Sequence, residues 1–183
     1  MLPVSALSAG YQVLPNGTAY RASIDVQDAK SYEFSDIGVM GQWVPLPVTD
    51  VRLTGAACDN CSFNWTGSSA IAFENGSYTV SFMAPLHESH FQAAYARQYN
   101  VNITLPQGFD VRNPFLGTLS PQGANVTRYP DNTTTIRWDN ATYFDVRFYD
   151  QAREDLLFLF GAIWIAIAAA LLVPFLITMQ KKE

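Results

Sequence analysis

An uncharged apolar segment of 23 residues, Leu156 to Thr178, lies close to the C-terminus and restricts how this chain can fold. A helix of about 20 residues spans the roughly 30 Å hydrocarbon core of a bilayer. A helix buried in a soluble core would be shorter and would carry a polar edge. The segment therefore predicts a transmembrane helix at residues 156–178, with the lipid bilayer as its partner.

The charges that flank this segment predict its orientation. Lys181 and Lys182 follow the segment, whereas Arg153 precedes it together with two acidic residues. An excess of positive charge close to a span favours the cytoplasmic side. We therefore expect a single-pass protein of the cell membrane, with residues 179–183 as a cytoplasmic tail and residues 1–155 outside.

Acceptor sites for N-linked glycans support the same orientation. The pattern Asn-x-Ser/Thr, with x not proline, occurs at eight of the ten asparagines: Asn16, Asn60, Asn64, Asn75, Asn102, Asn125, Asn132 and Asn140. Ten asparagines placed at random in this composition would form about one or two such sequons, and sequons mark surface loops of exported domains. The excess predicts a glycosylated domain on the outer side of the membrane.

The N-terminal residues do not form a complete export signal. Such a signal needs a basic region followed by an apolar stretch, and it ends in small residues. Met1–Gly10 has no basic side chain, although Ala6, Ser8, Ala9 and Gly10 are small. We expect a leader that this sequence lacks. The alternative is a tail-anchored protein with a cytosolic domain, and the sequons count against it.

Residues 1–150 show the alternation of apolar and polar residues that is typical of β-strands separated by turns. Alternating strands with one wet face favour antiparallel pairing. We therefore predict a mainly β protein, in which an antiparallel immunoglobulin-like β-sandwich at 1–150 is joined by a junction at 151–155 to the helix. The expected core residues are Tyr78, Val80, Phe82, Val101, Ile103, Leu105, Ile136, Trp138, Phe144, Val146 and Phe148. The segment Leu86–Gln98 is ambiguous between a short helix and an irregular strand.

Cys58 and Cys61 form a Cys-x-x-Cys pair with three possible interpretations. A local disulfide fits an oxidising exterior. A thioredoxin-like redox motif would need the pair at the start of a helix, whereas the flanking residues indicate a loop. The third interpretation adds His87 and His90, because two Cys and two His can hold a zinc ion. The His spacing is shorter than in zinc fingers, so we expect the disulfide and no bound metal.

Composition and motifs argue against several other classes of protein. The chain is 49% apolar and 15% charged, which excludes a disordered protein, and its net charge of −5 argues against a nucleic-acid partner. The sequence contains no nucleophile elbow, phosphate loop or dinucleotide fingerprint. We therefore expect no enzymatic activity and no cofactor. Seven carboxylates are expected in loops, with no pair held close together, and most of them are expected to be solubilising: Asp25, Asp28, Glu33, Asp36, Asp110, Asp139 and Asp145.

Small residues recur within the apolar segment. Ala162, Ala166 and Ala170 have a four-residue spacing that places them on one face of a helix. Such a face lets a second helix approach closely, although alanine is also common in membrane helices that pack against nothing.

The C-terminal 40% of the chain resembles an uncharacterised archaeal family with members in haloarchaea and methanogens. The matching pieces are Leu105–Gly108, Leu116–Gly123 and Ile136–Asp139, together with the join from the Arg-Phe-Tyr strand into the apolar segment. The resemblance implies an archaeal surface domain held by one C-terminal span. It implies no catalytic residues.

These observations favour a non-enzymatic, glycosylated domain at the cell surface, with a binding or structural role. An alternative is an accessory subunit of a larger membrane complex, docked through the alanine face. Its partner would be another membrane protein or a surface-layer component. A second alternative is an exterior metal-binding or redox protein that uses Cys58, Cys61, His87 and His90.

Overall fold

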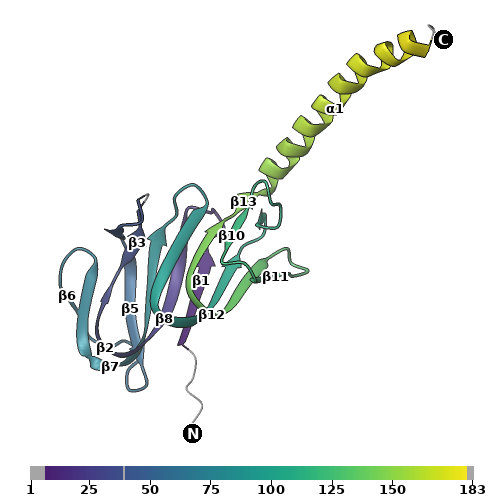
Figure 1. Ribbon diagram of the computed structural model, residues 1–183. Coiled ribbons are helices and arrows are strands. Elements are labelled where there is room, and N and C mark those ends of the chain that lie inside the picture. The colour runs from purple at the N-terminus through teal and green to yellow at the C-terminus, as the bar shows by residue number, and fades with distance from the viewer. Residues whose placement is uncertain (1–6, 39, 181–183) are drawn as a thin grey trace.

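The computed structural model describes residues 7–38 and 40–180 and shows a β domain followed by one long helix (Figure 1). The predicted mainly β fold with a single C-terminal apolar helix is therefore confirmed. The elements are β1 (Leu7–Val13), β2 (Ala19–Glu33), β3 (Ser35–Ile37), β4 (Trp43–Pro45), β5 (Thr49–Gly55), β6 (Asn64–Trp65), β7 (Ala70–Pro85), β8 (His90–Leu105), β9 (Phe109–Asp110), β10 (Thr118–Ser120), β11 (Asn125–Arg128), β12 (Thr134–Arg147), β13 (Tyr149–Asp150) and α1 (Gln151–Gln180).

Nine of the described strands form one sheet, with the order β10-β12-β8-β1-β2-β7-β5 and with β11 and β6 added beside β12 and β7. The ladders are antiparallel, as predicted, except for the one between β1 and β8. That ladder is parallel and pairs Leu7 with Tyr99 and Gln12 with Thr104. Alternation along a strand shows which face is buried but not the direction of the neighbouring strand, so the sequence could not reveal this pair.

The sheet folds back on itself because its longest strands are sharply bent. The register of β2 shifts after Val26, and the register of β12 shifts after Trp138. Asp28 and Asn140 lie at these bends with positive φ angles of 53° and 57°. A bulge of this kind kinks a strand, and Asp and Asn tolerate the left-handed conformation better than most residues. The two halves of each bent strand therefore belong to two facing layers, in a sandwich-like arrangement.

Aromatic side chains fill the space between the two layers. Tyr11 of the first layer meets Phe144 of the second at a centroid distance of 5.0 Å, and Phe82 meets Phe34 at the same distance. Of the predicted core residues all are buried except Tyr78, which is partly buried. Asn102 is exposed between the fully buried Val101 and Ile103, as alternation requires. The period-two pattern therefore identified the inward face of these strands correctly.

The ambiguous segment Leu86–Gln98 is a turn followed by a strand, so the helical alternative is wrong. Glu88 and Ser89 have positive φ angles of 53° and 57°, and His90 donates its backbone N–H to the carbonyl of His87 at 3.0 Å. Two consecutive positive φ angles are typical of the tight turns that join antiparallel strands. Strand β8 begins at His90 and continues to Leu105.

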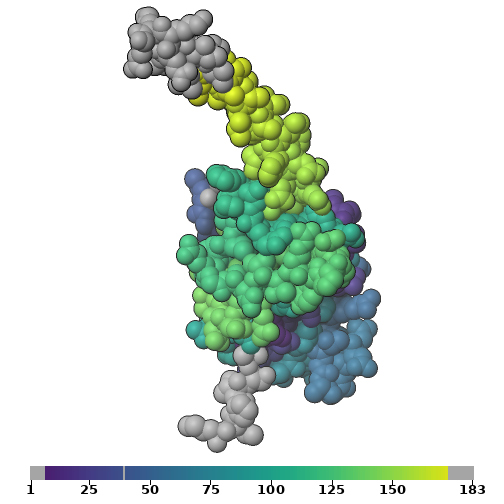
Figure 2. Space-filling model, turned by 90° about the vertical axis from the view of Figure 1, so that its right-hand side faces the viewer, coloured from purple at the N-terminus to yellow at the C-terminus, as the bar shows by residue number. Residues whose placement is uncertain are grey.

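Helix α1 begins at Gln151, directly after β13, and includes the segment predicted as a junction. The backbone N–H of Arg153 donates to Oδ1 of Asp150 at 2.8 Å, which is an N-terminal cap. The helix is long and apolar enough to cross a membrane, and Figure 2 shows that it leaves the domain without being covered by it. Lys181 and Lys182 lie outside the described residues, as does Ala6, whereas Ser8, Ala9 and Gly10 belong to β1.

Candidate functional site

A cavity lies next to β1, between the two layers of the domain. In the first layer β1 is placed between β2 and β8. Both neighbours continue beyond their bends into the second layer, whereas β1 consists of only seven described residues. Within the described residues no strand joins the second-layer parts of β2 and β8. Strand β3 reaches across at one end, where Nε2 of Gln92 donates to the carbonyl of Ile37 at 2.6 Å.

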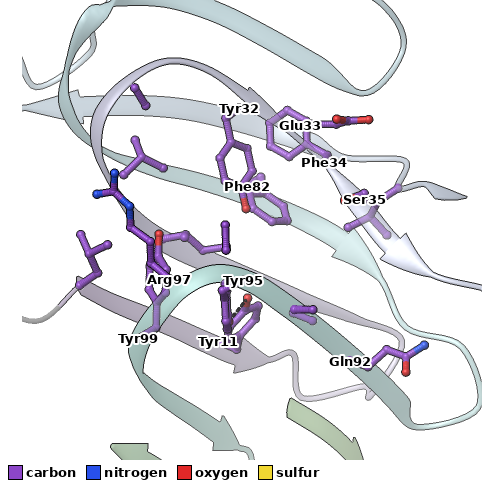
Figure 3. Close-up of a pocket in the computed structure, with 18 of the residues that line it drawn as sticks. Tyr11, Tyr32, Glu33, Phe34, Ser35, Phe82, Gln92, Tyr95, Arg97 and Tyr99 are labelled. Carbon is purple, nitrogen blue, oxygen red and sulfur yellow. Dashed lines mark hydrogen bonds between the residues drawn. The ribbon is translucent and has the colours of Figure 1, made fainter. Parts of the chain in front are cut away.

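Aromatic side chains from four strands line this cavity of about 300 Å³, which we call the tyrosine cavity. Figure 3 shows Tyr32, Phe34 and Phe82 on one side, with Tyr11, Tyr95 and Tyr99 facing them. Arg97 and Gln92 lie toward its opposite ends. The volume is at the lower end of the range of ligand pockets, which are about 300–1,000 Å³ and largely apolar with a few placed polar groups.

Five phenol hydroxyls are among the polar groups that line the tyrosine cavity, beside the side chains of Gln27, Glu33, Ser35, Gln92 and Arg97. The hydroxyls of Tyr11 and Tyr95 are hydrogen-bonded to each other at 2.7 Å, and the Tyr99 hydroxyl donates to the carbonyl of Asp25 at 2.7 Å. Tyr20 and Tyr32 also line the cavity. Within the described residues their hydroxyls have no hydrogen-bond partner, although Tyr20 is only 6% exposed.

Burial keeps these phenols uncharged. It raises the pKa values of Tyr11, Tyr20, Tyr32, Tyr95 and Tyr99 above their ordinary value of 10.0. The neighbouring phenols raise the pKa of Tyr32 further, and Asp36 does the same for Tyr20. The hydroxyls therefore remain neutral at any physiological pH and can both donate and accept hydrogen bonds.

Sequence reasoning did not find the tyrosine cavity. Its members come from strands that are far apart in the chain, and five of the nine tyrosines meet there. Alternation shows that a tyrosine faces inward, but it does not show that the opposite layer lacks a strand. One sequence feature hinted at the cavity: Tyr95 and Tyr99 are four residues apart on one strand and so lie on the same face of it. In the structure their rings stack with centroids 4.5 Å apart.

All eight sequon asparagines are exposed: Asn16, Asn60, Asn64, Asn75, Asn102, Asn125, Asn132 and Asn140. The other two asparagines are only partly exposed and make hydrogen bonds. Oδ1 of Asn100 accepts the backbone N–H of Asn140 at 3.3 Å, and Oδ1 of Asn113 accepts that of Phe115 at 3.0 Å. The surface asparagines are therefore the ones with an acceptor sequence.

Cys58 and Cys61 lie in the loop after β5, with their sulfur atoms at disulfide distance and their Cα atoms 5.3 Å apart. Gly55 and Cys58 form an isolated β-bridge, and the backbone N–H of Cys61 donates to the carbonyl of Leu53 at 2.7 Å. A thioredoxin-like motif requires the pair at the start of a helix. Here the pair lies in a loop between two strands.

We expect the non-reduced protein to have no free thiol and no bound zinc. The bond closes only a four-residue stretch, so its reduction should lower the free energy of unfolding by less than the ~3 kcal/mol expected for a 15-residue loop. Thiol titration in denaturant and melting curves with and without reductant measure both quantities. A Cys58→Ser/Cys61→Ser double variant, which should not respond to reductant, is the control. Stoichiometric zinc that is lost in His87→Ala would contradict this prediction.

The structure does not bring the two histidines to the cysteines. Gly55 pairs with Tyr78 of β7, whereas His87 follows the end of β7 at Pro85. The seven residue steps between Tyr78 and Pro85 span about 23 Å at ~3.3 Å per residue. No group of three potential metal ligands occurs among the described residues. His90 is instead paired with Asp145, Nε2 to Oδ1 at 2.8 Å, at a partly exposed position where an ion pair contributes little stability.

Asp110 corrects the expectation that the scattered carboxylates are solubilising. Its side chain is 11% exposed and accepts hydrogen bonds from the guanidinium groups of Arg112 and Arg128 at 2.7 and 3.3 Å. The backbone N–H groups of Val111 and Arg112 donate to the same carboxylate. The expected placement in loops is also wrong, because all seven carboxylates lie on strands. Asp28, Glu33 and Asp139 are exposed, and Asp25, Asp36 and Asp145 are partly exposed.

Ala162, Ala166 and Ala170 lie on α1 and are exposed. The described part of α1 contacts the domain only near its base, where Nδ2 of Asn113 donates to Oε1 of Glu154 at 3.5 Å. A partner helix on the alanine face remains a prediction, which co-purification from native membranes would test.

The fold and the site define a class of protein: a sandwich-like β domain with a tyrosine cavity that opens to the surface, continued by one apolar helix that could span a membrane. Within that class the chain belongs to DUF5803, described as a family of unknown function, whose sequence model matches residues 8–180. A search of curated proteins found no match.

Proposed function

We propose that this chain is a membrane-anchored, glycosylated cell-surface protein whose exterior β domain binds a ligand without catalysing a reaction. Helix α1 anchors the domain, the tail that follows it is cytoplasmic, and the tyrosine cavity is the binding site. The resemblance of the C-terminal part to archaeal surface domains supports an archaeal cell membrane as the location.

The exposure of every sequon asparagine is the observation that carries the exterior location. A glycan can be attached only where the asparagine side chain reaches solvent, and all eight acceptor asparagines are exposed. Asn102 shows the relation most clearly, because it lies on β8 between two fully buried residues, Val101 and Ile103. The same strand carries Asn100, which is partly exposed and has no acceptor sequence.

The chemistry of the tyrosine cavity supports a binding role rather than catalysis. Its walls are aromatic rings and its inner polar groups are phenol hydroxyls whose pKa values burial holds above 10.0. Such hydroxyls are weak acids and weak nucleophiles, but they orient a ligand through hydrogen bonds. The two charged lining residues, Glu33 and Arg97, are exposed and therefore belong to the rim.

Asn102→Gln is expected to lose one glycan in the native host and to migrate faster in denaturing gels. Thr104→Ala should give the same shift, because it removes the acceptor sequence and keeps the asparagine. Asn100→Gln, two residues away on the same strand, is the matched control and should not shift.

Protease added to intact cells should remove the domain and leave the C-terminal tail protected. A domain that resists protease in intact cells but is digested after lysis would place it inside and would overturn the proposed location. Unchanged mobility of both Asn102→Gln and Thr104→Ala would instead show that this sequon is unused.

A further inference from the structure

The tyrosine cavity holds more hydroxyl protons than its protein acceptors use. In the Tyr11–Tyr95 pair one hydroxyl donates to the other, which leaves the acceptor's own proton unused. Tyr20 and Tyr32 each add a hydroxyl without a partner within the described residues. Tyr20 is 6% exposed and lines the cavity, and its hydroxyl is not among the fully buried polar atoms of the described residues.

Hydroxyls that line the cavity without a protein partner determine what a ligand must offer when it displaces solvent from them. A buried polar group that loses its hydrogen bond on binding costs free energy, so these groups need acceptor atoms on any ligand that displaces water. A ligand that brings several hydroxyl oxygen atoms into the cavity meets this requirement, because each oxygen can accept a phenol proton and can donate to a phenol oxygen. An aromatic or aliphatic side chain alone would leave the hydroxyls of Tyr20 and Tyr32 unpaired.

The walls of the cavity exclude charged ligands of either sign from its interior. Ring faces carry a negative quadrupole, which disfavours an anion. A quaternary cation suits aromatic faces, but it offers no acceptor to the hydroxyl protons. Between the walls, formed on one side by Phe34 and Phe82 and on the other by Tyr11 and Tyr95, the ligand must also present apolar C–H surface.

We infer that the tyrosine cavity binds the ring of a neutral saccharide, whose C–H faces pack between the aromatic walls while its oxygen atoms pair with the phenol hydroxyls. This inference rests on the proposed binding role and adds the class of ligand. The volume of about 300 Å³ limits the buried part to a small ligand such as a single ring. The exposed side chains of Glu33 and Arg97 can pair with hydroxyls that extend beyond the rim.

The test uses the full chain in a detergent without a sugar headgroup. Methyl glycosides of glucose, galactose, mannose and N-acetylglucosamine are titrated, and binding is measured by saturation-transfer NMR. We expect at least one glycoside to bind, and we expect Tyr20→Phe and Tyr32→Phe each to weaken it about tenfold, the effect of one hydrogen bond to a neutral partner. Tyr143→Phe, at an exposed position outside the cavity, should bind as the parent does.

The melting temperatures of the variants show whether these hydroxyls bind a ligand or stabilise the fold. Because the Tyr20 hydroxyl has no partner within the described residues, Tyr20→Phe should melt at the parent temperature or above it. Tyr11→Phe should melt lower, because it breaks the hydroxyl pair with Tyr95. Glycoside binding that neither Tyr20→Phe nor Tyr32→Phe weakens would overturn the inference.

A second probe, toluene, distinguishes failure of the ligand class from failure of the binding role. Toluene has no hydrogen-bonding atom and gains nothing from the free hydroxyls, so Tyr20→Phe should not weaken its binding. If toluene binds and no glycoside does, the saccharide is wrong and the binding role stands. If neither probe binds, the binding role itself is contradicted.

Discussion

Trp138→Ala is expected to lower the free energy of unfolding by about 3–5 kcal/mol, the usual cost of truncating an aromatic residue in a core. Trp138 is 4% exposed and its ring stacks on Phe144 of the opposite layer at 6.2 Å. Its indole Nε1–H donates to the carbonyl of Pro121 at 2.8 Å. For a domain of this size such a loss lowers the melting temperature by about 6–20 °C. Circular dichroism of the full chain in detergent would measure it.

Two further variants show what the indole contributes. Trp138→Phe keeps an aromatic ring but loses the hydrogen bond to Pro121, so it should cost less than the alanine variant. Tyr143→Ala changes a residue of the same strand that is 44% exposed, and it should cost less than about 1 kcal/mol. Equal melting temperatures for Trp138→Ala and Tyr143→Ala would show that Trp138 does not hold the layers together.

The sequence predicted the buried faces of the strands because burial alone explains apolar residues at a period of two. It succeeded along β8 and β12, where Val101, Ile103, Ile136 and Trp138 are buried as expected. Tyr78 is the exception. It is only partly buried because it lies near the end of the ladder, where it packs on Phe73 at 5.1 Å and is paired with Gly55.

The position of the tyrosine cavity could not be predicted, because it depends on where strands bend. Nothing in the period of β2 or β12 shows that Asp28 and Asn140 adopt positive φ angles and turn each strand into a second layer. The cavity exists because β1, which lies between β2 and β8, does not continue through such a bend in the described residues. It is therefore a property of tertiary topology that no local pattern records.

The helix begins before the predicted span, because hydropathy marks the apolar segment rather than the whole helix. Gln151–Asp155 is polar, yet it continues the helix toward the domain under the cap supplied by Asp150. Acidic Glu154 lies in the first turn, where negative charge stabilises the helix dipole. The helix thus begins at the edge of the small sheet that β13 forms with β9, beside Asp110.

Asp110→Ala is expected to lower the free energy of unfolding at pH 7 by about 2–4 kcal/mol. Removing a buried carboxylate that accepts several hydrogen bonds costs 3–5 kcal/mol when its partners are buried too, and about half of the Arg112 side chain is exposed, which reduces the cost. The exposed pair of Arg137 and Asp139, 3.3 Å apart, provides a matched control. Asp139→Ala should cost less than about 1 kcal/mol.

The pH dependence of stability tests the same group without truncating it. Burial alone would raise the pKa of Asp110, but the hydrogen bonds from Arg112 and from the backbone of Arg112 and Val111 outweigh it and hold the pKa below its ordinary value of 3.8. A carboxyl whose pKa is lowered by folding stabilises the native state above its unfolded pKa, and this contribution is lost as the pH falls through the folded pKa. Asp110→Asn should therefore melt below the parent at pH 7, and the difference should narrow below about pH 4. If the difference in melting temperature between Asp110→Asn and the parent stayed constant down to pH 2, the charge of the Asp110 carboxylate would not stabilise the join between the domain and the helix.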